Sequence, residues 1–301
     1  MTRHGISRIP TLLALLLVSA QAGAAQYPVS GLVLRVDQST RTMVVSCQAI
    51  PGFMDAMAML FSVRDAKEFE GLAPGTMVDF TLIVEKESSH AENVHIRHFE
   101  SQAQEPLQAQ RLALLQKILQ PHASAATPLQ IGQQVPDFTL IDQKRRKVSL
   151  HQFVGKIVVL NFVYTRCPLP DFCYRFSNNF GRLQKRFAER MGKDIVLLTV
   201  TFDPVHDQPE ILAKYAKTWK ADPDNWRFVT GSVEDVQRIC GWFGVEYWPD
   251  EALLTHTQHT AILDGEGKLA ANLEGNQFTA EQLGDLAESL MNPAKMNRAE
   301  R

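Results

Sequence analysis

Alternating apolar and polar positions divide the chain into a part built of short strands and a part in which strands alternate with helices. In the first part, apolar side chains recur at nearly every second position of residues 78–84, the pattern of a half-buried strand. Turn-forming residues at 37–40 separate two further apolar runs, which predicts a β-hairpin. The predicted strands cover 32–36, 42–45, 59–63, 78–84 and 93–99. Short strands in this number within residues 27–100 predict a small all-β domain, an OB-like barrel that is closed or partly open.

The pattern of the second part, residues 131–292, predicts an α/β domain. The near-continuous apolar runs 157–163 and 195–202 are typical of central parallel strands that are covered on both faces. Residues 264–267 read as the turn of a hairpin near the end of this domain. The predicted helices cover 175–190, 209–219, 233–243 and 280–290. This order of elements resembles a thioredoxin-like fold.

The remaining segments are predicted to be connecting or terminal chain. Residues 101–130 form a linker, in which leucines at helical spacing predict one short amphipathic helix over 107–119. Prolines bracket that helix on both sides. Residues 293–301 are a polar tail.

Residues 1–25 have the three parts of a secretory signal peptide. Basic residues precede an apolar run at 12–18, and small residues follow at 22–25. The apolar run is shorter than the ~20 residues that span a bilayer, so an uncleaved signal that anchors the protein in the membrane is the weaker alternative. We expect cleavage, no membrane insertion afterwards, and a periplasmic protein.

Composition and cysteine content limit which ligands the protein can be expected to bind and which roles its cysteines can have. Lys and Arg number 31 against 33 Asp and Glu, a formal net charge of −2, which gives no reason to expect nucleic-acid binding. The four cysteines are too few for a disulfide scaffold, and Cys240, on a helical pattern, is interpreted as a buried structural residue. In an oxidising periplasm, paired thiols persist when they are catalytic, metal-bound or kept reduced by a partner.

Two cysteines lie at the position where α/β sheets place their reactive groups. Cys167 and Cys173 follow the apolar strand 157–163 and precede the helix that begins near Arg175. Ligands gather beyond the carboxyl ends of strands in such sheets. The two thiols can act as a catalytic redox pair or bind a soft metal. A plain stabilising disulfide is the alternative, although so short a loop restricts the unfolded chain relatively little.

A histidine would turn this thiol pair into a copper or zinc site. His256 and His259 lie just before or within the predicted strand 260–263. In a thioredoxin-like sheet that strand neighbours the one that carries the cysteines. His256, where the loop joins the strand, can point across to them, whereas His259 lies deeper along the strand.

Motifs spread over residues 131–291 carry a specific resemblance. They are Phe138-Thr139-Leu140, Gly155-Lys156, Tyr164-Thr165-Arg166-Cys167-Pro168, Thr201-Phe202-Asp203-Pro204 with Asp207, and His256-Thr257 ahead of Asp264. Together they are similar to the Sco/SenC family. The resemblance implies a thioredoxin-like fold that binds copper through two cysteines and a distal histidine, and a role in copper delivery and thiol reduction during cytochrome oxidase assembly.

By position, the resemblance assigns the copper ligands to Cys167, Cys173 and His256, with His259 as the runner-up because it does not align. Five residues separate the cysteines here, where the family pattern has three. Two of the five are prolines, which resist helix formation and stiffen the loop. Thioredoxin-type reductases and peroxiredoxins are less similar. The former have two residues between their cysteines and a proline just before the facing strand, where this chain has Leu254-Thr255-His256 and no proline. The peroxiredoxin cysteine pattern is absent.

A second set of sulfur-bearing residues lies in the all-β part. Met57 and Met59 are predicted to share one face of a strand, with Met54 one short turn upstream and Cys47 at the end of a neighbouring strand. Thioether and thiolate sulfur select Cu(I) over harder ions. The alternative interpretation is that the methionines fill gaps in a small core.

This second set resembles the CusF-like periplasmic copper-binding domains over residues 29–99. Those domains bind Cu(I) through one histidine and two methionines beneath a tryptophan. Met57 and Met59 fall on the methionine positions, Cys47 on the histidine position and Met54 on the tryptophan position. The resemblance therefore implies an all-sulfur Cu(I) site.

The sequence thus predicts a periplasmic metallochaperone that delivers copper toward cytochrome oxidase assembly. Its cargo would be Cu(I), or also Cu(II) at the Cys/Cys/His site, and its partner a copper-accepting protein such as an oxidase subunit. The linker would raise the effective concentration between the two sites to roughly the millimolar range. One alternative is an enzyme, a thiol–disulfide oxidoreductase that uses Cys167 and Cys173 with a thiol reductant partner. Another is copper sequestration for tolerance.

Overall fold

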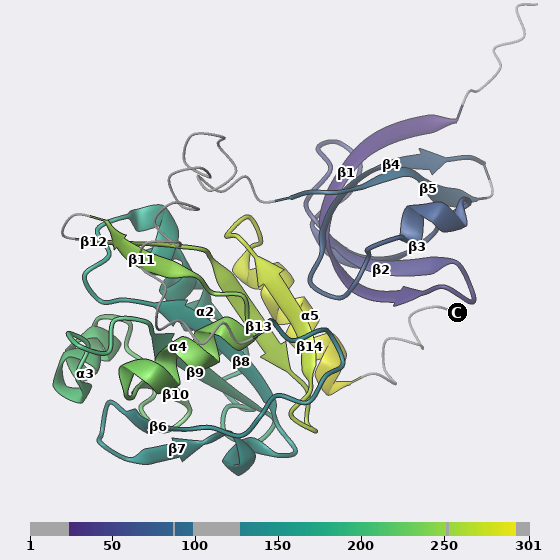
Figure 1. The fold of residues 1–301 in the computed structure, drawn as a ribbon. Helices are drawn as coiled ribbons and strands as arrows, with labels where there is room; N and C mark the ends of the chain where they lie inside the picture. The colour runs from purple at the N-terminus through teal and green to yellow at the C-terminus, as the bar shows by residue number, and fades with distance from the viewer. Residues whose placement is uncertain (1–23, 87, 99–126, 251–252, 293–301) are drawn as a thin grey trace, which may run out of the picture.

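The computed structural model describes residues 24–86, 88–98, 127–250 and 253–292 (Figure 1). The predicted helix at 107–119, most of the linker at 101–130, the polar tail at 293–301 and nearly all of the predicted signal peptide lie outside these residues. Within the described residues, no helix combines the length and the apolar character needed to span a bilayer.

The N-terminal part is one antiparallel sheet in the order β3-β2-β1-β4-β5. Its strands are β1 (Ala25–Asp37), β2 (Thr42–Cys47), β3 (Met57–Ser62), β4 (Met77–Val84) and β5 (Ser89–Ile96). The predicted hairpin is confirmed: β1 pairs with β2, and the Asp37 carboxylate accepts hydrogen bonds from the Ser39 and Thr40 amides in the turn. A short 3₁₀ helix (Ala66–Phe69) follows β3.

This sheet curls into a partly open barrel. Val63, just beyond β3, forms a bridge with Ala91 in β5, which brings the two edge strands together at one point. Alternate residues of β2, Met43, Val45 and Cys47, belong to the apolar interior. The fold class predicted for this part is confirmed.

The C-terminal part is a seven-stranded sheet in the order β14-β13-β8-β9-β10-β6-β7. Its strands are β6 (Thr139–Asp142), β7 (Lys147–Ser149), β8 (Ile157–Val163), β9 (Ile195–Thr201), β10 (Trp226–Thr230), β13 (His259–Leu263) and β14 (Leu269–Glu274). Strands β8 and β9 are parallel and β13 lies beside β8, as the sequence predicted. The structure adds β10, which runs parallel to β9, and shows that β13 runs antiparallel to β8. Every residue of β8 and β9 is buried, because both faces of the sheet are covered.

Four α-helices complete this thioredoxin-like domain, each close to its predicted range. They are α2 (Arg175–Arg186), α3 (Pro209–Thr218), α4 (Val233–Trp242) and α5 (Ala280–Met291). Thr279 and Gln282 form a capping box at the start of α5, and Ser232 caps α4. A 3₁₀ helix (Leu150–Phe153) links β7 to β8, and a wide turn (Pro170–Tyr174) leads into α2.

A separate two-stranded ribbon, β11 (Tyr247–Asp250) and β12 (Leu253–His256), corrects one expectation from the sequence. His256 was predicted to sit at the entry of the strand that contains residues 260–263. It is instead the last residue of β12, outside the seven-stranded sheet, while His259 begins β13. The ribbon, and not the seven-stranded sheet, therefore determines where His256 lies.

The two domains share a packed interface rather than being joined by the linker alone. Figure 1 shows β1 and β2 lying beside α5. Apolar side chains of the small domain join the core of the large one: Leu32, Leu34, Val44 and Met77. Gly75 comes so close that an added Cβ would lie 3.1 Å from the Leu273 side chain. Burial of these side chains favours docking of the two domains.

Polar contacts at the same interface involve the end of β2. Gln282 donates from Nε2 to the Ser46 carbonyl at 2.9 Å, and the Ser46 hydroxyl donates to Asp285 Oδ2 at 2.6 Å. Arg186, at the end of α2, donates to Asp285 Oδ1 at 2.7 Å. Asp285 therefore connects α2 and α5 to the strand that ends in Cys47.

We predict that Asp285→Ala lowers the free energy of unfolding by about 1–3 kcal/mol, because it leaves the buried Ser46 hydroxyl without its acceptor. Glu288→Ala is the matched control: Glu288 also accepts from Arg186 but lies on the half-exposed side of α5. It should cost less than about 1 kcal/mol. Urea unfolding followed by circular dichroism measures both, and equal losses would contradict this role for Asp285.

Candidate functional site

A buried carboxylate fixes the loop that follows β8 and carries Cys167. Asp207 accepts from the Thr165 amide at 3.0 Å, from the Thr165 hydroxyl at 2.5 Å and from the Thr201 hydroxyl at 2.6 Å. Since Thr201 ends β9, these bonds tie the loop to the neighbouring strand. The Cys167 amide then donates to the Tyr164 carbonyl at 3.3 Å, which turns the chain at the top of β8.

A second carboxylate holds the outer side of this loop. Asp203 accepts from the Arg166 guanidinium at 2.7 Å and from His206 Nδ1 at 2.8 Å. Burial opposes ionisation of Asp203, but the hydrogen bonds from His206 and Arg166 outweigh it and lower the pKa of this carboxyl. The resemblance drew attention to Asp203 and Asp207 through their motif, but their contacts with Thr165 and Arg166 are visible only in the fold.

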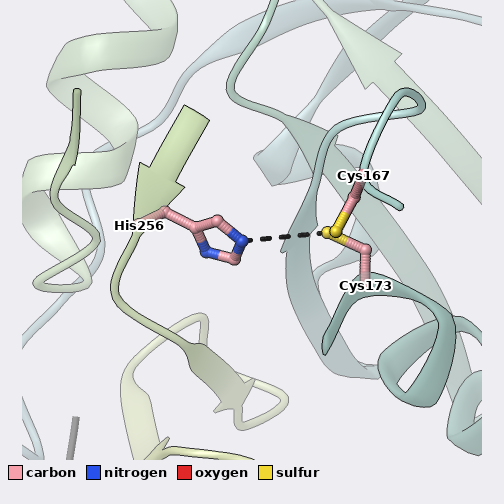
Figure 2. A group of neighbouring side chains, drawn as sticks. All are labelled: Cys167, Cys173 and His256. Carbon is pink, nitrogen blue, oxygen red and sulfur yellow. Dashed lines mark hydrogen bonds between the residues drawn. The ribbon is translucent and has the colours of Figure 1, made fainter. Parts of the chain in front are cut away.

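The long spacer still brings the two sulfurs together. After Cys167 the chain runs outward to Leu169 and turns back from Pro170, with the Phe172 amide donating to the Leu169 carbonyl at 3.3 Å. Cys173 therefore arrives just before α2, beneath Cys167. The ligand atoms of Cys167, Cys173 and His256 all lie within 4.8 Å of one another. Figure 2 shows the two sulfurs side by side, with the imidazole approaching from the opposite side.

The tautomer of His256 follows from its hydrogen bond. Nδ1 lies 2.8 Å from the Thr257 carbonyl oxygen, which can only accept, so Nδ1 carries a proton. In the neutral imidazole, Nε2 then has the free lone pair. Nε2 lies 3.9 Å from the Cys173 sulfur (Figure 2), so Nε2 is the ring nitrogen that faces the thiol pair.

The two thiols differ in acidity. The Cys173 thiol donates toward the Cys167 sulfur, and this hydrogen bond lowers the pKa of Cys167 well below that of an ordinary thiol, against the opposing effect of burial. The same contact and complete burial raise the pKa of Cys173. Burial and the nearby Cys167 raise the pKa of Tyr164 to about 12, so its phenol stays neutral. The pair at neutral pH therefore consists of one thiolate and one thiol.

The remaining candidates of the large domain lie outside this group. His259 is largely buried, with Nδ1 3.3 Å from Asn272 Oδ1, and burial lowers its pKa to about 4. It does not belong to the Cys/Cys/His group. Cys240 is fully buried in α4, and burial raises its pKa, which agrees with a structural role.

In the small domain, the sulfur residues lie at one end of the barrel. Cys47 pairs directly with Met57, and Val45 with Met59, so all of these side chains share the inward face of the sheet. Cys47 is buried, which raises its pKa to about 12, whereas Met57 is 51% exposed. Met54 packs against the same core from a turn closed by hydrogen bonds with Ile50. The structure thus brings Cys47 and Met57 together, with Met54 and Met59 bordering the same interior.

Comparisons with known proteins agree with both parts. The SCO1/SenC family model matches residues 126–291, and the family model of the copper binding periplasmic protein CusF matches residues 26–96. The SCO1 protein homolog of Bacillus subtilis (strain 168) is 31% identical over 161 residues, which are 49% of this chain and 81% of that protein.

Two further proteins extend these comparisons. Protein sco1 of Schizosaccharomyces pombe is 28% identical over 156 residues, 48% of this chain, and the match spans only 56% of its length. Among solved structures, a SCO1/SenC family lipoprotein from Bacillus anthracis is 24% identical, with a TM-score of 0.48, over 53% of this chain and 95% of that one.

We predict that the reduced protein keeps one thiolate as the pH falls from about 9 to about 6, because the pKa of Cys167 lies below that range. The pKa values of the other three thiols are raised, so they stay protonated there. Thiolate absorbance in the ultraviolet measures this. Cys167→Ser should abolish the signal, and Cys240→Ser should leave it unchanged. A midpoint near the ordinary value of about 8.5 would contradict the assignment.

Proposed function

The chain belongs to the SCO1/SenC family, and we propose that it is a metallochaperone which holds copper between Cys167, Cys173 and His256 and passes it to a copper-accepting protein. The observation that carries this proposal is the convergence of two sulfurs and one imidazole nitrogen from separate parts of the fold within 4.8 Å. Sco-family proteins are copper-binding proteins involved in cytochrome oxidase assembly, which suggests an oxidase subunit as the acceptor.

The donor set fits Cu(I) well. Soft thiolate ligands and imidazole both suit this ion. The lowered pKa of Cys167 provides a thiolate, Nε2 of His256 faces the thiols, and Cys173 has to release its proton when the metal binds. Among the described residues, the group includes no fourth His, Cys, Asp or Glu. A structural zinc site needs four protein ligands, so this three-donor group does not fit one.

The small domain is proposed as a second Cu(I) site, formed by Cys47, Met57 and Met59 with Met54 beside them. The match of residues 26–96 to the CusF family model supports this, as does the direct pairing of Cys47 with Met57. The exposed Met57 offers an entry point for the ion, while the raised pKa of Cys47 means that binding must displace its proton. The periplasmic description of that family supports an exported protein.

Thiol–disulfide exchange is a second candidate function, favoured by the unequal acidity of the two thiols. The Cys167 thiolate would attack a client disulfide and release one client thiolate. Cys173 would then attack the mixed disulfide, give its proton to solvent and release the second client thiolate. The client is reduced by two electrons and Cys167–Cys173 is oxidised, so a thiol reductant partner is required to restore the pair.

A Cu(I) titration of the reduced protein tests the copper proposal. We predict two equivalents bound by the wild type, and loss of one equivalent in Cys167→Ala and in His256→Ala. Even residues that only orient a metal ligand typically contribute about 10–100-fold in affinity, so loss of a ligand should cost at least as much. Met57→Leu should weaken only the other equivalent. His151→Ala, an exposed histidine paired with Asp137, is the control and should change neither.

Unchanged Cu(I) binding in both Cys167→Ala and His256→Ala would overturn the proposed site in the large domain. Disulfide reduction by the same variants then separates the two functions. Thiol exchange requires Cys167 but not a histidine ligand. An exchange rate that falls in Cys167→Ala and persists in His256→Ala, without copper binding by the wild type, would establish the oxidoreductase.

A further inference from the structure

Aromatic rings from three separate segments surround the imidazole of His256. The centroid of Phe202 lies 4.6 Å from that of the imidazole, Tyr164 lies at 6.0 Å and Phe172 at 6.3 Å. Tyr164 and Phe172 meet the ring edge to face, at interplanar angles of 85° and 78°. Tyr164 and Phe202 are fully buried parts of the core, whereas Phe172 is partly buried and forms the outer side of this enclosure.

Phe172 differs from the other two aromatic residues in its place in the chain. It lies in the spacer between the cysteines, next to Cys173, and the turn that begins at Pro170 directs it back toward the site. The hydrogen bond from the Phe172 amide to the Leu169 carbonyl closes this turn. The long spacer therefore supplies an apolar side chain beside the ligand atoms, in addition to the second sulfur.

We propose that Phe172 makes the Cys167–Cys173–His256 site selective for Cu(I) over Cu(II) by covering it with an apolar ring. This inference rests on the proposed copper function. Cu(II) favours tetragonal sites with nitrogen and oxygen ligands, and a three-donor protein site supplies such a geometry only when water completes it. A ring in contact with the imidazole excludes that water, whereas Cu(I) is satisfied by the sulfurs and the imidazole.

The enclosure also limits how the imidazole moves. The Nδ1 hydrogen bond to the Thr257 carbonyl sets the tautomer, and the rings of Phe172 and Phe202 lie beside the imidazole. Arg166 and Asp203, on the outer side of the loop, are paired with each other. A cavity opened at Phe172 would admit water beside the imidazole.

The midpoint potential of bound copper tests this role, because it reports the ratio of Cu(II) to Cu(I) affinity. Phe172→Ala should raise the Cu(II) affinity relative to that for Cu(I) by about tenfold, which lowers the one-electron midpoint potential by about 59 mV. Phe172→Leu keeps an apolar side chain and should stay near the wild type. Leu169→Ala is the matched control, since this exposed side chain lies in the same spacer.

Electron paramagnetic resonance of the Cu(II) form supplies an independent signature. Phe172→Ala should gain coupling to exchangeable water protons that the wild type and Leu169→Ala lack. A potential unchanged from the wild type in Phe172→Ala, with a drop in melting temperature alone, would show that Phe172 only packs, and would overturn this inference. In that case Cu(I) binding that still depends on Cys167 and His256 would leave the metallochaperone proposal intact. A wild type that binds no copper would overturn both.

Discussion

The Asp207 carboxylate is the constraint on which the site depends. It is fully buried, and its three hydrogen bonds join the loop after β8 to the end of β9. Burial raises the pKa of Asp207, so the hydrogen bonds that favour its charged form offset a real desolvation cost. Because this anchor sets where Thr165 lies, it also sets where Cys167 enters the site. The positions of Cys173 and the spacer follow from that point.

From this geometry the chemistry of the three ligands becomes unequal. The contact between the two sulfurs lowers the pKa of Cys167 and raises that of Cys173, so the two thiols differ in acidity. The carbonyl of Thr257 fixes the tautomer of His256, so its free nitrogen faces the thiols. The same pair of thiols is suited to binding Cu(I) and to attacking a disulfide. Both candidate functions therefore need the cysteines, and only copper binding also needs His256.

Docking of the small domain changes how the two proposed copper sites relate to each other. A flexible tether alone would let the barrel sample many orientations. The shared core at Leu32 and Met77, and the contacts of Ser46 with Gln282 and Asp285, hold one orientation instead. Cys47 directly follows Ser46, which is hydrogen-bonded to α5, and α5 packs against α2. One proposed ligand of the small site therefore lies next to a residue that is fixed to the large domain. Exchange of copper between the sites would then require a defined route or undocking.

The sequence by itself determined most of the elements and the identity of the thiol site. Continuous apolar runs defined β8 and β9, because both faces of these strands are buried, and the position of Cys167 after β8 marked the functional edge of the sheet. Only the tertiary structure decided how a five-residue spacer returns Cys173 to Cys167, and that His256 is presented by the ribbon β11–β12 rather than by β13. It also decided the contacts of Asp207 and Phe172 and the docking of the barrel. These features depend on contacts between residues far apart in the chain, which no local pattern of hydrophobicity encodes.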